Sequence, residues 1–328
     1  MNSKKTNNLI SVENAQEIIF SKFKKLETIK KKLIDSSGFI LEKEIKALFD
    51  LPNKNNSAMD GFAVRYEDLE PNKSLKVVGR VGAEAITDYV LKKDEALRIM
   101  TGSGIPEGAD SVVPFEKTNN NPHKGNDFPD SVLINETVKK GDNIRLSGQD
   151  YKFGETVVKG GMLIDPPIVG AIASFGINEV SVIRKPLVSV ISTGNELVMP
   201  GDKLKEGQIY DSNSFAISAA IKNSGADFKM HRILSDNKED VDKLYEDCSQ
   251  SDLIVTIGGV SKGDFDLIRD AISSKGSIDF WGINMKPGKP LAFGQVKIKG
   301  KNLFHIGLPG NPVTVSYTHL RAHETAVN

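Results

Sequence analysis

The 328-residue sequence predicts a multidomain α/β protein: a mostly parallel, doubly wound α/β domain, a small β domain and an elongated α+β linking region. Two observations support this fold class. After residue 185, apolar runs of strand length alternate with helical patterns, as in βαβ units with a parallel sheet. Between residues 51 and 141, short β-prone runs are bounded by Gly, Pro and Asn. We therefore expect an N-terminal helix and linking segment over residues 1–50, a small β domain over 51–141, a linking region over 142–184 and an α/β domain over 185–315.

The N-terminal segment predicts one amphipathic helix, because apolar residues recur at three- and four-residue spacing from Val12 to Leu33. Six lysines between residues 22 and 32 form its polar face. A solvated helix face explains them better than a nucleic-acid patch, since the chain holds 43 Lys and Arg against 43 Asp and Glu. We therefore expect no nucleic-acid partner.

The small β domain is expected to be antiparallel or barrel-like, with strands over residues 75–81, 96–100, 111–115 and 131–134. Two further segments, 55–63 and 100–106, are small and glycine-bearing, and each by itself indicates a loop. In the linking region, Asp165-Pro166-Pro167 begins a helix that Gly176 ends, and residues 180–183 follow as a strand.

The α/β domain has the most regular pattern. Strands are expected over residues 187–192, 228–234, 252–257, 278–284, 291–296 and 302–306. Helices are expected from the cap Asp211-Ser212-Asn213 to about Gly225, over 236–250 and over 264–274. In parallel sheets ligands bind beyond the carboxyl ends of the strands. The loops that follow these strands are therefore the first candidates for a site.

The loop after strand 252–257 has the composition of an anion site. Gly258 and Gly259 let backbone N–H groups approach an anion, while Ser261 and Lys262 supply a hydroxyl and a cation. The spacing is not that of a P-loop, and a tight strand-to-helix turn is the alternative. Asp266 lies on the first turn of the next predicted helix, where it either stabilises the helix dipole or binds Mg²⁺ that faces a phosphate.

Three more loops follow predicted strands: Thr193-Gly194-Asn195-Glu196, Lys286-Pro287-Gly288-Lys289-Pro290 and Leu308-Pro309-Gly310-Asn311-Pro312. Lys286 and Lys289 are point charges suited to oxyanions, or else they are solvated lysines on a turn. Asn311 can cap a following helix that has Pro312 at its first position. By the topology rule the four loops converge at one edge of the sheet, which is a stronger indication than any single loop.

The composition excludes several kinds of site. Cys248 is the one cysteine, so the chain has no intrachain disulfide, and its acidic neighbours indicate an inert helix residue. His319 and His323 have the spacing of zinc ligands, but no third ligand follows. No run of about 18 apolar residues and no secretory signal is visible, so we expect no membrane segment.

Taken in order, these segments resemble the molybdopterin molybdenumtransferase family, which includes bacterial MoeA and the gephyrin E domain. The motifs that carry the resemblance are Asn56-Ser57-Ala58-Met59-Asp60-Gly61, Met100-Thr101-Gly102, Gly108-Ala109-Asp110, Ser192-Thr193-Gly194-Asn195-Glu196-Leu197, Asp211-Ser212-Asn213, Gly258-Gly259-Val260-Ser261, Lys286-Pro287-Gly288-Lys289-Pro290 and Pro309-Gly310-Asn311-Pro312.

The resemblance implies a MoaB/Mog-like molybdopterin-binding α/β domain, and the insertion of molybdate into adenylylated molybdopterin with release of AMP. It implies Mg²⁺, a cytoplasmic setting, a homodimer with its site between two subunits, and the molybdopterin adenylyltransferase as a candidate partner. The implied catalytic residues are Asp60, Glu196, Asp236 and Asp266, of which Glu196 and Asp266 are also the metal ligands. The implied cofactor-binding residues are Thr101, Thr193, Gly194, Gly258, Gly259, Ser261, Lys286, Lys289, Pro309, Asn311 and Pro312.

The sequence departs from the family pattern at a few positions. Asn55 stands where Asp is usual, Phe62 replaces a common Tyr, and Gly282 stands where Lys is frequent. The family continues into a C-terminal β-barrel domain, whereas residues 316–328 match no family pattern and are interpreted as an unrelated tail. The alternative function is a non-catalytic molybdopterin-binding or scaffold module. A single-domain adenylyltransferase is a third option, against which the β domain argues.

Overall fold

The computed structural model describes residues 9–82, 88–119, 129–231, 238–258, 272, 275–286 and 289–311. These residues form two compact units. Unit 1 holds the described residues up to Lys30, residues 38–40 and those from Ser181 onward, and unit 2 holds residues 31–37 and 41–180. The N-terminal helix therefore groups with the α/β domain. The finer domain boundaries given above remain predictions.

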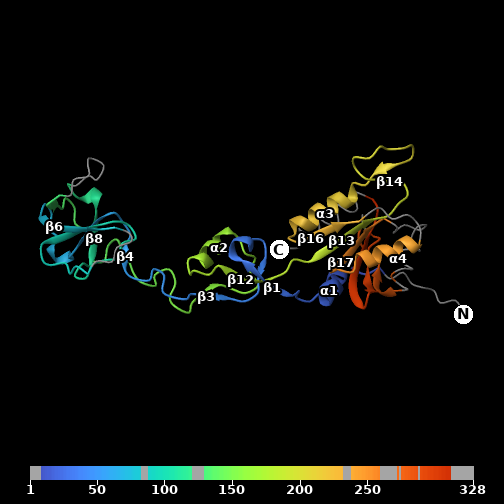
Figure 1. The fold of residues 1–328 in the computed structure, drawn as a ribbon, viewed down its shortest axis with the longest axis horizontal. Helices are drawn as coiled ribbons and strands as arrows, with labels where there is room; N and C mark the ends of the chain where they lie inside the picture. Colours follow the sequence, from blue (N-terminus) through green and yellow to red (C-terminus); the bar gives the residue numbers. More distant parts are fainter. Residues whose placement is uncertain are drawn as a thin grey trace. The chain divides into compact units, whose positions relative to one another are not determined.

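Unit 1 is built on a six-stranded mixed sheet in the order β16-β13-β17-β20-β19-β18 (Figure 1). The strands are β13 (Leu187–Ser192), β16 (Asp227–Met230), β17 (Leu253–Ile257), β18 (Gly276–Trp281), β19 (Ala292–Ile298) and β20 (Lys301–Leu308). The first four in this order pair in parallel, whereas β19 runs antiparallel to both of its neighbours. The predicted mostly parallel α/β fold is confirmed, with an antiparallel hairpin at one side.

Helices cover both faces of this sheet, which is the doubly wound arrangement. On one face, α1 (Val12–Lys22) and α3 (Asn213–Asn223) pack against a core that includes Val190 and Phe293. On the other face, α4 (Lys238–Asp247) packs against a core that includes Ile191 and Ile254. Between β13 and α3, the short strands β14 (Leu197–Val198) and β15 (Ile209–Tyr210) pair in parallel.

The single helix expected from Val12 to Leu33 is wrong beyond Lys22. Helix α1 ends there, and β1 (Thr28–Lys32) and the 3-10 turn η1 (Leu33–Asp35) follow. Strand β1 is a neighbour of β12 (Glu179–Ile183), which also pairs with β2 (Ile40–Leu41). The apolar spacing runs on through this segment, but pairing with a strand far along the chain overrides the local pattern.

The small β domain of unit 2 contains a five-stranded sheet in the order β8-β5-β7-β6-β9. Its strands are β5 (Gly61–Val64), β6 (Ser74–Val81), β7 (Glu95–Ile99), β8 (Ser111–Pro114) and β9 (Ser131–Leu133), with the 3-10 turns η2 (Tyr66–Asp68) and η3 (Phe115–Lys117). The four predicted strands are confirmed. The sheet is mixed rather than antiparallel, because β6 and β7 pair in parallel.

Strand β5 is absent from the prediction, which placed residues 55–63 in a loop. It lies between β7 and β8 and pairs with both, and all four of its residues are buried. A strand buried on both faces has a short continuous apolar run instead of an alternating pattern. Gly61 is required here, since a Cβ at this position would lie 2.1 Å from the backbone oxygen of Val113.

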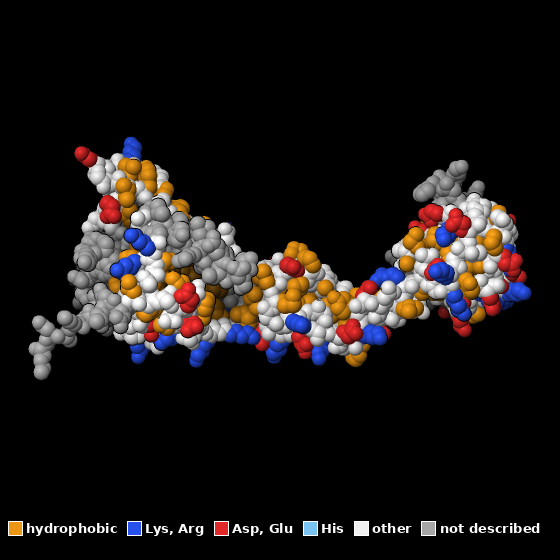
Figure 2. Space-filling model, turned by 180° about the vertical axis from the view of Figure 1, so that it is seen from behind, with side chains coloured by type: hydrophobic (Ala, Val, Ile, Leu, Met, Phe, Trp, Pro, Cys, Tyr) orange, Lys and Arg blue, Asp and Glu red, His pale blue; other side chains and the backbone are white. Residues whose placement is uncertain are grey.

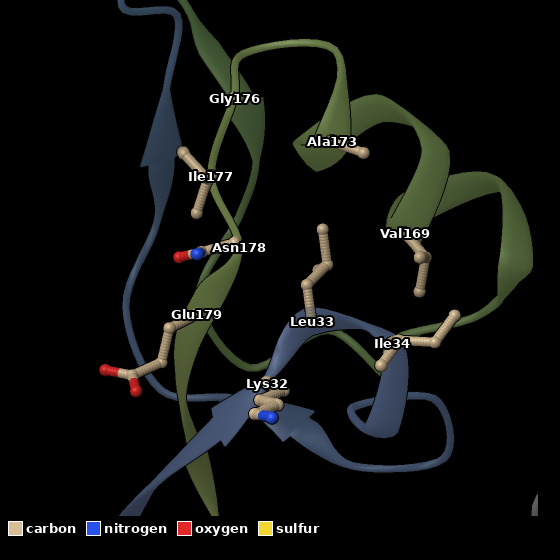
Figure 3. A pocket seen from close by; sticks show the side chains of 9 residues that line it. All are labelled: Lys32, Leu33, Ile34, Val169, Ala173, Gly176, Ile177, Asn178 and Glu179. Carbon is tan, nitrogen blue, oxygen red and sulfur yellow. The ribbon is translucent and has the colours of Figure 1, made fainter.

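The linking region of unit 2 contains α2 (Pro166–Ala173), which begins where the Asp165 carboxylate accepts the Ile168 N–H at 2.9 Å. Short ladders join β3 (Ile45–Lys46) to β11 (Thr156–Val158) and β4 (Asn56–Ser57) to β10 (Ile144–Arg145). Apolar side chains gather on the surface around α2 (Figure 2). A pocket between η1 and α2 has Ile34 and Val169 facing each other, and no predicted site residue lines it (Figure 3).

Several predictions fall outside the described residues: most of the helix over 264–274, the start of the helix over 236–250 and the tail over 316–328. Within the described ranges, none of the helices combines the length and the apolar character that a membrane span needs.

Arg184 connects three segments of unit 1. Its Nη atoms donate to both carboxylate oxygens of Asp252 at 2.6 and 2.7 Å, and its Nε donates to Glu27 at 2.5 Å. Asp252 also accepts the Leu187 N–H at 2.9 Å. Burial alone would raise the pKa of the Asp252 carboxyl, but these hydrogen bonds outweigh it and lower that pKa. The cluster holds the starts of β13 and β17 together.

We expect Arg184→Ala to lower the free energy of unfolding of unit 1 by about 2–3 kcal/mol, because it leaves the largely buried Asp252 carboxylate with only the longer ion pair to Lys301, at 3.9 Å, among the described residues. Trp281 is the one tryptophan and lies in β18, so its fluorescence in a urea titration reports on unit 1. The control is Lys275→Ala, which removes a more exposed pair with Asp242 and should cost less than about 1 kcal/mol. Equal losses in the two variants would contradict the prediction.

Candidate functional site

The carboxyl ends of three adjacent strands of unit 1 lie at the same level. Ser192 of β13 pairs with Ile257 of β17, and Ile257 pairs with Leu308 of β20. Strand β18 runs in the same direction as β20, because both are antiparallel to β19, and it ends at the level where β20 ends. The loops after all four strands therefore begin at one edge of the sheet, as the sequence predicted.

The loop after β13 presents a carboxylate at this edge. The Thr193 N–H donates to the Ile257 carbonyl at 3.0 Å, which ties the loop to β17. Gly194 has a φ of +144°, and a Cβ at this position would lie 2.7 Å from a carboxylate oxygen of Glu196. The Glu196 side chain, which is exposed, therefore lies back over the backbone of the loop.

Gly258 follows β17 in a conformation that only glycine adopts readily. Its φ is +92°, and a Cβ there would lie 2.7 Å from the Thr193 carbonyl oxygen and 2.9 Å from the Thr193 Oγ1. Its own N–H donates to the Leu308 carbonyl at 3.0 Å. The first residue of the glycine-rich loop is thus in close contact with the loops on both sides.

The turn after β20 is held from two sides. Pro309 is buried, whereas Gly310 and Asn311 are exposed. A Cβ at Gly310 would lie 3.4 Å from the Gly258 Cα, so the turn packs directly on the glycine-rich loop. On its other side, the Asn213 Nδ2 donates to the Gly310 carbonyl at 2.8 Å.

The lysine-bearing loop follows β18. Lys286 and Lys289 are both exposed, and the Ile283 N–H donates to the Lys289 carbonyl at 2.9 Å. Ile10, near the N-terminus, also supports this loop: it pairs with Ile283, and its carbonyl accepts the Asn284 N–H at 2.7 Å. The sequence did not predict this support, because Ile10 and Ile283 lie far apart in the chain. An apolar residue by itself does not indicate which segment it pairs with.

In unit 2, the structure brings Asp60 and Thr101 together. One carboxylate oxygen of Asp60 accepts both the backbone N–H and the hydroxyl of Thr101, each at 2.7 Å. The backbone N–H and then the hydroxyl of Thr101 lower the pKa of the Asp60 carboxyl, and Arg98 adds to this effect. Both side chains are exposed, so a charged carboxylate with a fixed orientation lies at the surface of the β domain.

The other predicted site residues, Asp236, Gly259, Ser261, Asp266 and Pro312, lie outside the described residues. Within the part of the chain that the structure describes, no cluster of three or more His, Cys, Asp or Glu residues could hold a metal ion. The Mg²⁺ ligand set implied by the resemblance therefore has one described member, Glu196.

The departures from the family pattern have local explanations. The Asn55 Oδ1 accepts the Ser147 N–H at 2.9 Å, a bond that either Asn or Asp can accept. Gly282 has a φ of +101°, and a Cβ there would lie 3.0 Å from a methyl carbon of Leu9, so lysine would be strained here. Phe62 is fully buried against Phe115.

Cys248 is also buried, and burial raises the pKa of its thiol.

Two family models match the chain. The MoeA N-terminal region, domains I and II, matches residues 10–176, and a probable molybdopterin binding domain matches residues 189–321. A molybdopterin molybdenumtransferase from Haemophilus influenzae is 37% identical over 287 residues, which cover 87% of this chain and 69% of the relative. One from Staphylococcus epidermidis is 36% identical over 329 residues, covering 97% of this chain and 75% of the relative.

A solved structure supports the same relationship. The molybdopterin biosynthesis MoeA protein from Pyrococcus horikosii is similar with a TM-score of 0.76 and 34% identity, covering 95% of this chain and 78% of that one. The fold and the matches together define a transferase of molybdenum cofactor biosynthesis with a molybdopterin-binding domain. The chain belongs to the MoeA family of molybdopterin molybdenumtransferases.

Proposed function

We propose that this chain inserts molybdate into adenylylated molybdopterin and releases AMP. The observation that carries the proposal is the convergence of four loops at one edge of the unit 1 sheet. They combine a glycine backbone, a carboxylate and two lysines, which suit an anionic ligand with its metal. The membership of the MoeA family supports the same reaction.

The loop that begins at Gly258 would hold the phosphates. The close contacts of Gly258 with Thr193 and with the Leu308 carbonyl keep the backbone at this first residue in place before a ligand arrives. Such preorganisation reduces the cost of ordering the site on binding. We assign Thr193, Gly194, Gly258, Gly259 and Ser261 to this part.

Mg²⁺ would lie next to the phosphates, and Glu196 fits as one of its ligands. Mg²⁺ prefers oxygen ligands and is commonly held by one or two carboxylates together with substrate phosphates. The exposed Glu196 carboxylate lies over the backbone of the loop after β13, at the edge of the sheet where the phosphates would bind. A carboxylate in this place suits Mg²⁺ as a ligand. We assign Asp266 as the second carboxylate and Asp236 as a further catalytic residue. When bound, the ion would neutralise charge on the leaving phosphate.

The two lysines would serve a different part of the same ligand. Strand β18 lies three strand spacings from β17, which corresponds to roughly 15 Å. An elongated substrate, with a pterin at one end and adenosine at the other, can span that distance. We assign Lys286, Lys289, Pro309, Asn311 and Pro312 to the molybdate end, where ammonium groups attract molybdate oxygens.

Asp60 and Thr101 belong to unit 2, and we propose that they act across a homodimer on the site of the other subunit. Their shared hydrogen bonds fix the orientation of the carboxylate, and by lowering its pKa they favour its charged form. A cytoplasmic setting and a supply of substrate from the molybdopterin adenylyltransferase complete the proposal.

The experiment is to mix the chain with adenylylated molybdopterin, Mg²⁺ and molybdate and to measure AMP. We expect AMP release, and we expect Asp60→Asn to lower kcat/KM about a hundredfold. The Asn oxygen can still accept both bonds from Thr101, so this loss would reflect the missing charge. The matched control is Asp88→Asn, which changes an exposed carboxylate of the same unit.

Full activity in Asp60→Asn would remove that residue from the mechanism. Substrate binding without AMP release by the unmodified chain would contradict the catalytic proposal and favour the binding or scaffold module. Size-exclusion chromatography with light scattering tests the homodimer separately, since a monomer that releases AMP would rule out action across subunits.

A further inference from the structure

The Asp211-Ser212-Asn213 motif lies at the start of α3, outside the four loops, yet it contacts one of them. The Asn213 Nδ2 donates to the Gly310 carbonyl at 2.8 Å, across 97 positions of sequence. Asn213 is the first residue of α3, and its side chain is half-buried. A helix terminus thus reaches the turn that follows β20.

The position of Asn213 is itself fixed by its neighbour Asp211. The Asp211 carboxylate accepts the Ser214 N–H at 3.1 Å and the Ser214 hydroxyl at 2.5 Å, and both residues are buried. The Asp211 N–H donates to the Val198 carbonyl at 2.9 Å. The helix therefore starts from a rigid support, and the Asn213 amide has little freedom to leave Gly310.

The other side of the turn lies against the glycine-rich loop. A Cβ at Gly310 would lie 3.4 Å from the Gly258 Cα, and the Gly258 N–H donates to the Leu308 carbonyl. The turn is therefore held between β17 and α3. Of these two supports, the bond from Asn213 is the one made by a side chain, so it can be removed without changing the backbone of the site.

We propose that Asn213 is a positioning residue for the turn Leu308–Asn311, which it holds against Gly258 in the geometry that binds the anionic substrate. This inference rests on the proposed function. The role requires a short side chain with an N–H donor. A carboxylate at this position cannot donate, and it would repel the Gly310 carbonyl oxygen.

The test is Asn213→Asp in the full chain. A carboxylate in the first turn of a helix is favoured by the helix dipole, so α3 itself should remain folded. We expect the KM for molybdate to rise at least fivefold while kcat changes less than threefold. We also expect faster hydrogen–deuterium exchange in peptides that cover residues 309–311. The matched control is Asn223→Asp at the other end of α3, which should change neither quantity.

Three outcomes would overturn the inference. The first two are an unchanged KM for molybdate and unchanged exchange in the turn in Asn213→Asp. An equal change in Asn223→Asp would also overturn it, because the effect would then come from the helix and not from the bond to Gly310. If the unmodified chain releases no AMP, the proposed reaction fails by itself. In that case the inference is tested by the molybdate affinities of Asn213→Asp and Asn223→Asp, measured by calorimetry. A weaker affinity in Asn213→Asp alone would support it, and equal affinities would overturn it.

Discussion

Replacing Gly258 with alanine is expected to lower kcat/KM for AMP release about a hundredfold. The new Cβ would lie 2.7 Å from the Thr193 carbonyl oxygen, and backbone atoms cannot move aside as the end of a flexible side chain can. The φ of +92° adds strain for any residue with a Cβ. The loops after β13 and β17 must therefore separate, and displacements of about 1 Å at a reacting site can cost a hundredfold in rate.

A matched control separates this close contact from the backbone strain alone. Gly300, in the turn between β19 and β20, has a φ of +84°, but no heavy atom of the described part of the chain lies within 4 Å of an added Cβ. Gly300→Ala should lower the unfolding free energy by about 1–2 kcal/mol and leave kcat/KM unchanged. Activity within threefold of normal in Gly258→Ala would show that the close approach to Thr193 does not matter for the reaction.

The stability of unit 1 is expected to fall steeply with acid because of His305. This side chain of β20 is fully buried, and burial lowers its pKa to about 3. Neither ring nitrogen has a hydrogen-bond partner among the described residues, and the centre of the buried Tyr245 ring lies 6.0 Å from that of the imidazole. The neutral imidazole is therefore tolerated in this core, whereas the charged one is not.

The direction in which the stability changes with pH follows from proton binding. Between the folded pKa of about 3 and the ordinary value of 6.5, the unfolded chain binds a proton at His305 that the folded chain does not. Stability thus falls as the pH drops through this window, by about 1.4 kcal/mol per pH unit and by about 2 kcal/mol at pH 5. We expect His305→Leu to be at least as stable as the unmodified chain at pH 7.5, and clearly more stable at pH 5.

Urea titrations followed by the fluorescence of Trp281, at pH 7.5, 6 and 5, measure this difference. Carboxylates such as Asp252 also lose stabilising charge on acidification, but they do so in both proteins, so the difference between them isolates His305. Parallel losses of stability in the two proteins would show that His305 does not control the acid response.

Much of the fold could be predicted from the sequence, at the positions where the local sequence pattern favours the same element that the tertiary contacts stabilise. The strand over residues 187–192 was predicted with its observed limits, because it is a short, mostly apolar segment rich in β-branched residues, and five of its six residues are buried in a parallel sheet. The start of α3 was also predicted, since its cap is a contact between residues three positions apart. Prediction failed at β1 and β5, whose partners lie far away in the chain.

The candidate site shows the same division. Its four loops could be assigned to one edge, because the topology rule needs only the order and direction of the strands. The pairing of Asp60 with Thr101 was not foreseen, since it joins residues 41 positions apart through one carboxylate oxygen. At Asn55 and Gly282 the sequence shows only that a carboxylate and a lysine common in the family are replaced. The structure adds that Asn55 accepts the Ser147 N–H and that Gly282 has a positive φ.

The sequence by itself determined the succession of strands and helices, the glycine-rich and lysine-bearing loops and the family resemblance, because these depend on residues close together in the chain. Only the tertiary structure decided which contacts hold those loops in place. The bond from Asn213 to Gly310, the support of Ile283 by Ile10 and the close approach of Gly258 to Thr193 all join distant segments. Such contacts depend on how the strands align in space, and no local periodicity encodes that alignment.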